Sequence, residues 1–361
     1  MKKMRENKTR RGISLLLIAI MVLFTTVLLN GCGKTDAKPV LNVLNYGAYI
    51  DKSLLDDFEK EFNCKVVYDT YNSPEDMYIK FKSGATNYDV IITGEYMVER
   101  LRTEGMLEKL DFSNIANAEF IEEEFKNQPY DPTNEYAVPY FWGTLGVLYN
   151  KETVDVSSNS WNVLWDDKYA GRVIMMDSQR DTFSVALKTL GYSLNTTDEK
   201  ELDEALNLLL KQKKNVMAYV VDAAKDMMIG GEADLALVWS GEATGAMISE
   251  DGNTEFGFMI PKEGSNIWID AMCIPKDAKN KTLGEKYIDF LTRTESTLKN
   301  VNEVMYSTVQ ADATSKLPEI LKNNNAFNVD LETIKTLEMF RDLKDNIGLY
   351  NDRWTELMGT N

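Results

Sequence analysis

The chain has 361 residues, of which 44% are hydrophobic, so it can bury a large core, which we expect to be divided between two lobes. It contains no histidine, which excludes Ser-His-Asp and Cys-His catalytic sites, histidine metal sites and imidazole bases. The net charge of −17 argues against nucleic acid as a partner. There is no glycine-rich phosphate loop or cysteine metal cluster, so we expect neither a cofactor nor a metal.

The first segment has the pattern of a secretory signal. Six basic residues precede an apolar run over 13–29. The run ends in Leu29-Asn-Gly-Cys32, which is similar to a bacterial lipobox, so we expect removal of residues 1–31 and lipidation of Cys32. An uncleaved membrane anchor would give the same topology. Either way, the folded part is expected outside the cytoplasmic membrane, or in the periplasm of a cell with an outer membrane, tethered by the linker 32–39.

The mature chain is more acidic than the precursor. Loss of the six basic residues and of Glu6 changes the net charge from −17 to −22, which is compatible with a cationic ligand. Two further cysteines, Cys64 and Cys273, lie in or beside apolar runs, and the sequence leaves open whether they pair.

Strands and helices alternate in the first part of the chain. The apolar periodicity predicts strands over 41–45, 65–68 and 88–92, and helices over 51–62, from Ser73-Pro74 onward, and over 95–104. This alternation predicts an α/β lobe with a largely parallel sheet. The strand ends at Tyr46-Gly47 and Thr93-Gly94 then lie at the carboxyl edge, where such sheets bind ligands.

The apolar run 136–149 is long enough to cross into a second lobe, where the pattern repeats. We expect helices over 161–167, 182–190, 198–212 and 223–228, and strands over 172–176, 215–220, 233–239 and 256–260. The chain returns to the first lobe with a strand over 266–275 and a helix over 284–292, and ends in helices near Leu317, Leu331 and Tyr350. Lobe 1 would comprise 40–144 and 269–314, and lobe 2 would comprise 145–268 and 315–361.

Trp268-Ile-Asp270 is the most informative stretch. It lies in a strand with apolar residues on both faces, which is typical of burial in a parallel sheet. Trp268 and Asp270 share one face, and a buried carboxylate needs a partner. An indole beside a carboxylate suits a ligand ammonium group. The alternative is a core tryptophan beside an aspartate that a local backbone N–H satisfies.

Further aromatic and acidic residues stand at the predicted strand ends. They are Tyr46, Tyr49, Tyr96, Asp177, Asp181 and Trp239. Together with Trp268 and Asp270 they would suit a flexible polyamine. Aromatic walls would bury its methylenes, at ~0.8 kcal/mol each, and the acids would neutralise its ammonium groups.

These stretches resemble the spermidine/putrescine-binding proteins of bacterial polyamine ABC importers. The resemblance runs through Leu44-Asn-Tyr-Gly-Ala-Tyr49, Val138-Pro-Tyr-Phe-Trp-Gly143, Ser160-Trp-Asn-Val-Leu-Trp165, Val238-Trp-Ser-Gly241, Pro261-Lys-Glu-Gly264 and Trp268-Ile-Asp270. It covers nearly the whole mature chain. It implies an α/β, two-lobed type II periplasmic-binding-protein fold with the ligand in the cleft, and it implies a monomer. The partners it implies are a permease and its ATPase, with the membrane reached through the N-terminal lipid.

The resemblance also assigns site residues. It places an aromatic box at Tyr46, Tyr49, Tyr96, Trp239, Trp268 and Tyr306, and amine-binding acids at Asp181 and Asp270. Ser178 stands where some spermidine binders have an acid, and Gly47 and Gly94 replace hydroxyl residues. The family's polar C-terminal contact falls near Phe340-Arg341. These departures leave open which polyamine is bound; the missing charge at Ser178 alone leans the choice towards putrescine.

Two other kinds of function remain open. An aromatic box also suits a thiamine-like or betaine-like cation, and paired tyrosines could hold ferric ion without histidine. A secreted hydrolase could use a carboxylate pair such as Asp177 and Asp181, although no activated nucleophile is visible. No feature of the sequence argues for an adhesive surface protein.

Overall fold

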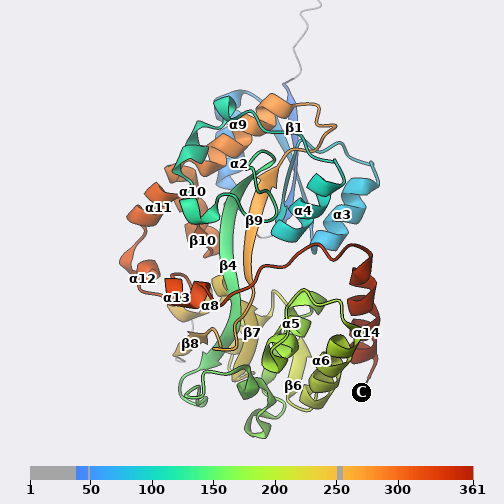
Figure 1. Ribbon diagram of the computed structural model, residues 1–361. Helices are drawn as coiled ribbons and strands as arrows, with labels where there is room; N and C mark the ends of the chain where they lie inside the picture. The colour runs from blue at the N-terminus through green and yellow to red at the C-terminus, as the bar shows by residue number, and fades with distance from the viewer. Residues whose placement is uncertain (1–37, 48, 250–254, 361) are drawn as a thin grey trace, which may run out of the picture. The chain divides into compact units, whose positions relative to one another are not determined.

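The computed structural model describes residues 38–47, 49–249 and 255–360, and residues Val40–Asn361 form one compact unit (Figure 1). The expected signal over 1–31 and the lipidation site Cys32 lie outside the described residues. Among the helices that the structure does describe, none has the length and apolar character needed to cross a membrane.

The described strands form one mixed sheet. They are β1 (Val40–Tyr46), β2 (Lys65–Tyr71), β3 (Val90–Gly94), β4 (Ala137–Asn150), β5 (Val173–Met175), β6 (Val216–Tyr219), β7 (Leu235–Trp239), β8 (Phe256–Met259), β9 (Ile267–Cys273) and β10 (Ser307–Thr308). Their order is β2-β1-β3-β9-β4-β7-β5-β6, with β8 and β10 also paired to β4. The outer pairs are parallel, whereas β9 and β4 are antiparallel to their neighbours.

The helices are shared between the two halves of this sheet. They are α2 (Ser53–Phe62), α3 (Pro74–Lys82), α4 (Glu95–Thr103), α5 (Gln179–Leu190), α6 (Glu199–Gln212), α7 (Ala224–Ile229), α8 (Ser240–Ile248), α9 (Lys281–Thr292), α10 (Thr294–Val304), α11 (Ala311–Lys316), α12 (Glu319–Lys322), α13 (Leu331–Ile334) and α14 (Ile347–Gly359). Figure 1 shows β1, α2, α3, α4 and α9 around one half, and α5, α6 and α14 beside the other.

β4 joins the two halves because it changes partners along its length. Residues 137–144 pair with β9, and residues 145–150 pair with β7 and β8. β9 was expected in a parallel sheet because both its faces are apolar. It is instead antiparallel to both β3 and β4, since it runs back from the second half to the first.

The two halves have separate cores. One apolar cluster joins β1, β3, β9 and the first part of β4 to α2, α4 and α9. In the second half, successive residues of β4 enter opposite clusters, with Val147 in one and Leu148 in the other. This alternation is the period of two, and it places a buried layer on each face of the sheet. Two lobes, each with its own core, are what the sequence predicted.

Most predicted elements are present, and the exceptions have local causes. The segment 161–167 was expected as a helix but forms two 3-10 turns, Trp161–Trp165 and Asp167–Tyr169. The Asp166 carboxylate accepts the Lys168 N–H, which ends the first turn and starts the second. α8 and α10 were not predicted. α8 contains two glycines, and α10 is mostly polar, with its apolar residues limited to Leu298, Val301 and Val304.

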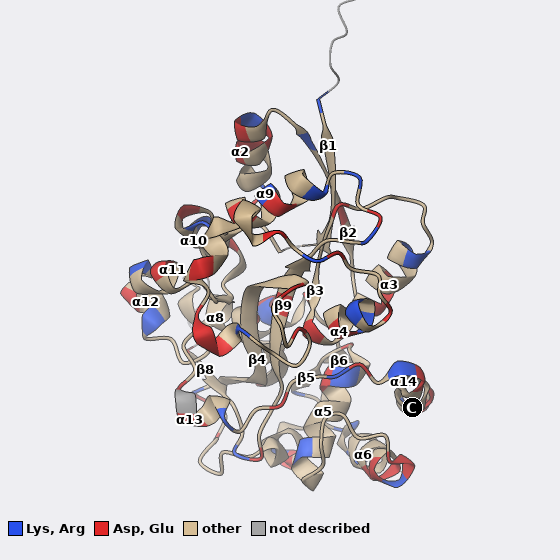
Figure 2. Cartoon of the chain, turned by 45° about the horizontal axis from the view of Figure 1, so that its top comes forward, with Lys and Arg blue, Asp and Glu red and all other residues tan. Residues whose placement is uncertain are grey.

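The charged residues are mixed over the helices. Figure 2 shows Lys and Arg interspersed with Asp and Glu on α3, α4, α12 and α14 rather than gathered into one basic face. A nucleic-acid interface would need such a face; the absence of a nucleic-acid partner stays a prediction from the net charge.

Candidate functional site

The predicted binding residues gather where strands end and helices begin. β3 passes directly into α4 at Gly94, β7 passes into α8 at Trp239, and α5 begins after Ser178. The ends of these strands meet at an edge of the sheet, which is where open α/β sheets hold ligands. The chain therefore delivers aromatic and acidic side chains from both halves to one region.

The pairing of β4 with β9 defines the face on which this region lies. Asp270 stands opposite Phe141, and Trp268 stands opposite Gly143. Directly opposed residues in a sheet share a face, so these four residues point to the same side. A Cβ atom at Gly143 would come within 2.4 Å of the Trp268 ring, so only glycine leaves room for the indole.

Asp270 lies at one end of the region and is held by two tyrosines. The Tyr49 hydroxyl donates to Oδ2 at 2.6 Å, and the Tyr46 hydroxyl donates to Oδ1 at 3.4 Å. Burial raises the pKa of Asp270 to about 7, although both hydroxyl hydrogen bonds act to lower it. Phenols carry no charge, so a positively charged ligand group would stabilise this carboxylate.

Four rings form a continuous wall beside Asp270. Tyr46 meets Tyr49 edge to face at 5.4 Å between ring centroids, and Tyr49 meets Tyr306 at 5.6 Å. Tyr306 meets Trp268 at 5.1 Å. Edge-to-face contacts fix the orientation of the rings relative to one another. Such rings can bury an alkyl chain and present their negative faces to cations.

A second acid, Asp181, stands in the first turn of α5. Its carboxylate accepts from the Ser178 hydroxyl at 2.6 Å and from the Trp239 indole Nε1 at 3.2 Å. Burial raises its pKa, and these two hydrogen bonds oppose the shift. Asp177, its proposed partner in a hydrolase, is exposed, so the two carboxylates occupy different environments.

Tyr306 connects the two acidic ends. The pKa of its hydroxyl is raised first by burial and then by the carboxylates of Glu242, Asp270, Asp222 and Asp181. One phenol therefore lies within electrostatic reach of both predicted amine-binding acids. Their field makes the region strongly attractive to a cation.

Tyr96 lies on the other side of Asp270. Its hydroxyl donates to Glu75 at 3.0 Å. A Cβ atom placed on Gly94 would lie 3.6 Å from Asp270 Oδ1, 3.7 Å from the Tyr46 hydroxyl and 3.7 Å from the Tyr96 ring. The structure thus brings all nine binding residues selected from the sequence into one region, and Gly94 lies beside three of them.

Three acids in this region were not predicted as site residues. Glu95 and Glu242 follow the strand ends at Gly94 and Trp239 by one and three residues, and Glu75 reaches Tyr96 from α3. The positions of Glu95 and Glu242 were a usable signal, because the first turn of a helix after a strand faces the same edge. Nothing in the sequence indicated that Glu75 contacts Tyr96.

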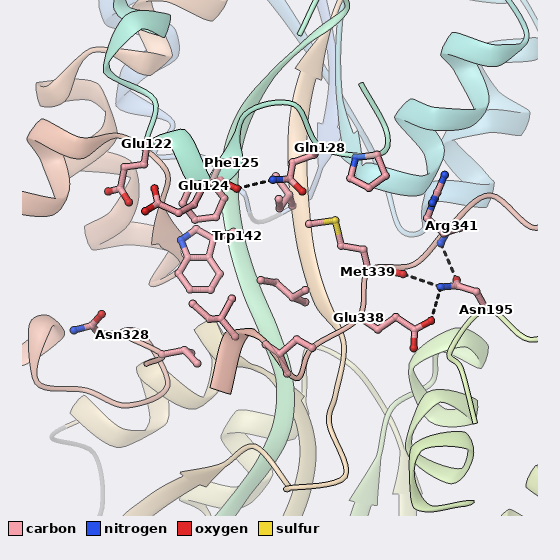
Figure 3. A pocket seen from close by; sticks show the side chains of 16 residues that line it. Glu122, Glu124, Phe125, Gln128, Trp142, Asn195, Asn328, Glu338, Met339 and Arg341 are labelled. Carbon is pink, nitrogen blue, oxygen red and sulfur yellow. Dashed lines mark hydrogen bonds between the residues drawn. The ribbon is translucent and has the colours of Figure 1, made fainter. Parts of the chain in front are cut away.

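The opposite face of β9 borders a different pocket. This pocket has a volume of about 680 Å³, and its lining includes Ile267, Ile269 and Trp142. Figure 3 shows it from close by. These three side chains alternate with Phe141, Trp268 and Asp270 along the two strands, so β4 and β9 separate the pocket from the aromatic wall. Its polar lining includes Glu122 and Gln128.

The C-terminal strap, residues 334–343, lines one side of this pocket. Glu338 of the strap accepts from Lys188 at 2.6 Å, and Arg341 pairs with Glu99 of α4 at 2.5 Å. The sequence placed a polar ligand contact near Phe340-Arg341. In the structure the Phe340 ring lies 6.3 Å from Tyr96, while Arg341 lines the pocket on the other face.

The position of Tyr306 depends on a glycine of α8, and this gives a prediction. A Cβ atom at Gly241 would lie 2.3 Å from the Tyr306 ring, so Gly241→Ala should cost about 1–3 kcal/mol of unfolding free energy by overpacking. Gly245, one turn later, has only the Lys225 side chain nearby, at 3.5 Å. Gly245→Ala should therefore be neutral or stabilise by up to ~1 kcal/mol. Urea unfolding measures both, and equal effects would contradict this packing.

Over the described ranges, no three residues from His, Cys, Asp and Glu are grouped so that they could hold a metal ion. The acids of the site instead face aromatic rings and hydroxyl groups, an arrangement that suits an organic cation.

Comparison with known proteins gives one consistent result. Residues 53–329 match the family model described as bacterial extracellular solute-binding protein. The chain is 35% identical over 326 residues to the spermidine/putrescine-binding periplasmic protein of Escherichia coli K12, covering 89% of this chain and 92% of the relative.

Two solved structures are also similar. A spermidine/putrescine ABC transporter substrate-binding protein of Streptococcus pneumoniae is 38% identical, with a TM-score of 0.77 and coverage of 89% and 99% of the two chains. The Tp0655 lipoprotein of Treponema pallidum is 29% identical, with a TM-score of 0.77 and coverage of 88% and 99%.

Proposed function

Since this chain belongs to the bacterial extracellular solute-binding proteins, we propose that it captures a polyamine outside the cytoplasmic membrane and delivers it to an ABC importer. In this role it binds its ligand and does not transform it. The names of its relatives in Escherichia coli and Streptococcus pneumoniae support spermidine or putrescine as the ligand.

One observation carries the proposal. Two buried carboxylates, Asp270 and Asp181, stand at an aromatic wall, and both have pKa values raised by burial. Each carboxylate is therefore stabilised when a ligand ammonium group supplies the positive charge that it lacks. The rings between them bury methylenes at ~0.8 kcal/mol each. A diamine supplies both features in one molecule.

Capture requires the two lobes to close over the ligand. β4 and β9 connect the lobes, and the strap runs beside β9, with the Ile267 N–H bonded to Glu338 O at 3.2 Å. We assign 40–144 with 269–314 to lobe 1, and 145–268 with 315–361 to lobe 2. Rotation about these few segments is the kind of hinge motion that encloses a ligand.

The experiment that tests this function is calorimetry of the signal-free protein. Putrescine, spermidine, glycine betaine, thiamine and ferric ion would each be titrated into it. We expect saturable binding of a polyamine and none of the others at comparable concentration. Tight binding of betaine or thiamine, with no binding of a polyamine, would show that the ligand is another class of cation.

Membrane attachment is a separate part of the proposal. We assign Cys32 as the lipidated N-terminus and the protein as a monomer held at the outer face of the membrane. The similarity to a Treponema pallidum lipoprotein supports this assignment. Mass spectrometry of the membrane-extracted protein should show a mature chain beginning at Cys32 with added acyl mass, and Cys32→Ala should lose that acyl mass.

Selectivity between polyamines should depend on Ser178. Its hydroxyl donates to Asp181, so position 178 itself adds no second charge beside that carboxylate. A third ammonium group would be poorly compensated, which favours putrescine over spermidine. Ser178→Asp should tighten spermidine binding by roughly tenfold, or about 1.4 kcal/mol.

Competition titrations of putrescine against spermidine measure this preference. Ser157→Asp, at an exposed serine, adds the same charge elsewhere on the surface and serves as the control. Spermidine binding more tightly than putrescine in the unmodified protein, or no gain with Ser178→Asp, would refute the assignment of selectivity to this position.

A further inference from the structure

Glu95 is a buried acid next to the site. It is the first residue of α4, and its exposed fraction is 2%. Gly94, immediately before it, pairs with Asp270 in the β3–β9 register. The backbone therefore carries Glu95 to within one residue of the position opposite Asp270, on the neighbouring strand.

The Glu95 carboxyl group is only partly satisfied. Its Oε2 accepts the Ile269 N–H at 3.3 Å, whereas Oε1 has no hydrogen-bond partner among the described residues. A buried carboxylate with an unpartnered oxygen is costly, because the charge has lost water without gaining a donor. A bound proton removes this cost in the absence of a nearby cation.

The charged and titratable groups around Glu95 oppose one another. Asp270 on β9 disfavours its anion, Arg180 on α5 favours it, and Tyr130 and Tyr96 are neutral phenols in the same field. Arg180 lies over the Phe340 ring at 4.3 Å, and its hydrogen bonds go to carbonyl and amide oxygens. Burial, the largest effect, raises the pKa of Glu95 to about 8.

On the basis of the proposed function, we propose that Glu95 is a proton-bearing positioning residue, which holds a proton in the empty site and releases it when a ligand ammonium group binds Asp270. The positive charge of the arriving ligand offsets the repulsion between the two carboxylates, so Glu95 can ionise beside Asp270. Glu95 then loses its proton to water, while the ligand ammonium keeps its own. No covalent bond forms or breaks apart from this O–H bond.

Protonation of Glu95 is coupled to that of Asp270. Burial raises the pKa of both Asp270 and Glu95, and the negative charge of an ionised Asp270 raises that of Glu95 further, so it holds the proton on Glu95. Ligand binding above pH 7 therefore releases the Glu95 proton. Release of one proton strengthens binding by up to about tenfold per pH unit, so affinity rises with pH through this range.

Stability of the empty protein should show the opposite trend. A carboxyl group whose pKa is raised by folding contributes stability that is fully present below its unfolded value, near 4.5, and is lost as pH rises through about 8. The melting temperature of the ligand-free protein should fall between pH 6 and 8.5, and Glu95→Gln should reduce that fall.

The test is titration calorimetry with putrescine and spermidine from pH 6.5 to 8.5, in buffers of different ionisation enthalpy. We expect the unmodified protein to release a proton near pH 7.5, with Kd falling by about three- to tenfold per pH unit. Glu95→Gln should bind with less proton release and with a Kd that changes less than about twofold per unit above pH 7.

Glu122→Gln is the matched control. Glu122 is also an acid whose pKa is raised by burial, but it lines the pocket behind β9, so its replacement should leave ligand-linked proton release unchanged. Polyamine binding without proton release in the unmodified protein would overturn the inference even if Glu95→Gln failed to fold. No polyamine binding at all would instead refute the proposed function.

Discussion

Replacement of Asp270 by asparagine should weaken polyamine binding by at least about 100-fold, or about 3 kcal/mol. The change keeps the shape of the side chain and removes its charge. Asp270 accepts hydrogen bonds from Tyr49 and Tyr46, and an asparagine can keep one of them through its carbonyl oxygen. The loss therefore reports the ammonium–carboxylate interaction more than a collapse of the tyrosines. Calorimetry with putrescine measures it.

Asp277→Asn provides the control for this change. Asp277 lies shortly after β9 and is exposed, so the same chemical substitution should leave Kd within about twofold. Asp270→Asn should also raise, rather than lower, the melting temperature above pH 7, because a buried charge has been removed. Unaltered affinity in a folded Asp270→Asn protein would show that the ammonium group binds elsewhere.

Truncation of Trp268 to alanine should weaken binding by about 2 kcal/mol or more, which is roughly 30-fold. The indole lies edge to face on Tyr306 at 5.1 Å and packs over Gly143. It is half-buried, and its Nε1 has no hydrogen-bond partner among the described residues. Its loss removes a wall of the site and the cation–π surface of the largest ring.

Trp354→Ala is a closely matched control. Trp354 of α14 is also half-buried and also meets a tyrosine edge to face, Tyr219, at 5.9 Å. Both variants should lose comparable stability, but only Trp268→Ala should lose affinity. Tryptophan fluorescence should shift on adding ligand to the unmodified protein, and the shift should shrink in Trp268→Ala. Equal affinities for the two variants would place Trp268 in the core rather than in the site.

The local structure of this chain could be predicted from its sequence because its signals are short-range. Ser73 accepts the Asp76 N–H at the start of α3, and Asp198 accepts the Lys200 and Glu201 N–H groups at the start of α6. Such caps involve neighbours in the chain and need no knowledge of the fold. The apolar period of β4 likewise indicated one long buried strand joining two lobes.

Tertiary context decided the elements that local signals missed. α8 has two glycines and small residues, and it forms because Ala243 and Ala246 are buried in the second-half core while Gly241 admits Tyr306. The direction of β9 relative to its neighbours also could not be predicted from the local sequence. Apolar residues on both faces indicate burial, but whether the neighbouring strands run parallel or antiparallel depends on where the chain has come from.

The sequence by itself determined the chemistry of the site. The absence of histidine, the acids at strand ends and the alternation of Trp268 with Asp270 all follow from residue identity and from a period of two. Resemblance to known binding proteins added Tyr306, whose neighbouring sequence contains no such signal.

Only the tertiary structure decided which ionisable side chains lie close enough to interact electrostatically. Glu95 and Asp270 are 175 residues apart in the chain, and the β3–β9 register makes them neighbours. Glu75 reaches Tyr96 in the same way, through the packing of α3 beside α4. Burial and long-range proximity set the proton affinity of a carboxyl group, and both depend on contacts between distant segments, so the raised pKa values of Asp270 and Glu95 could not be read from the sequence.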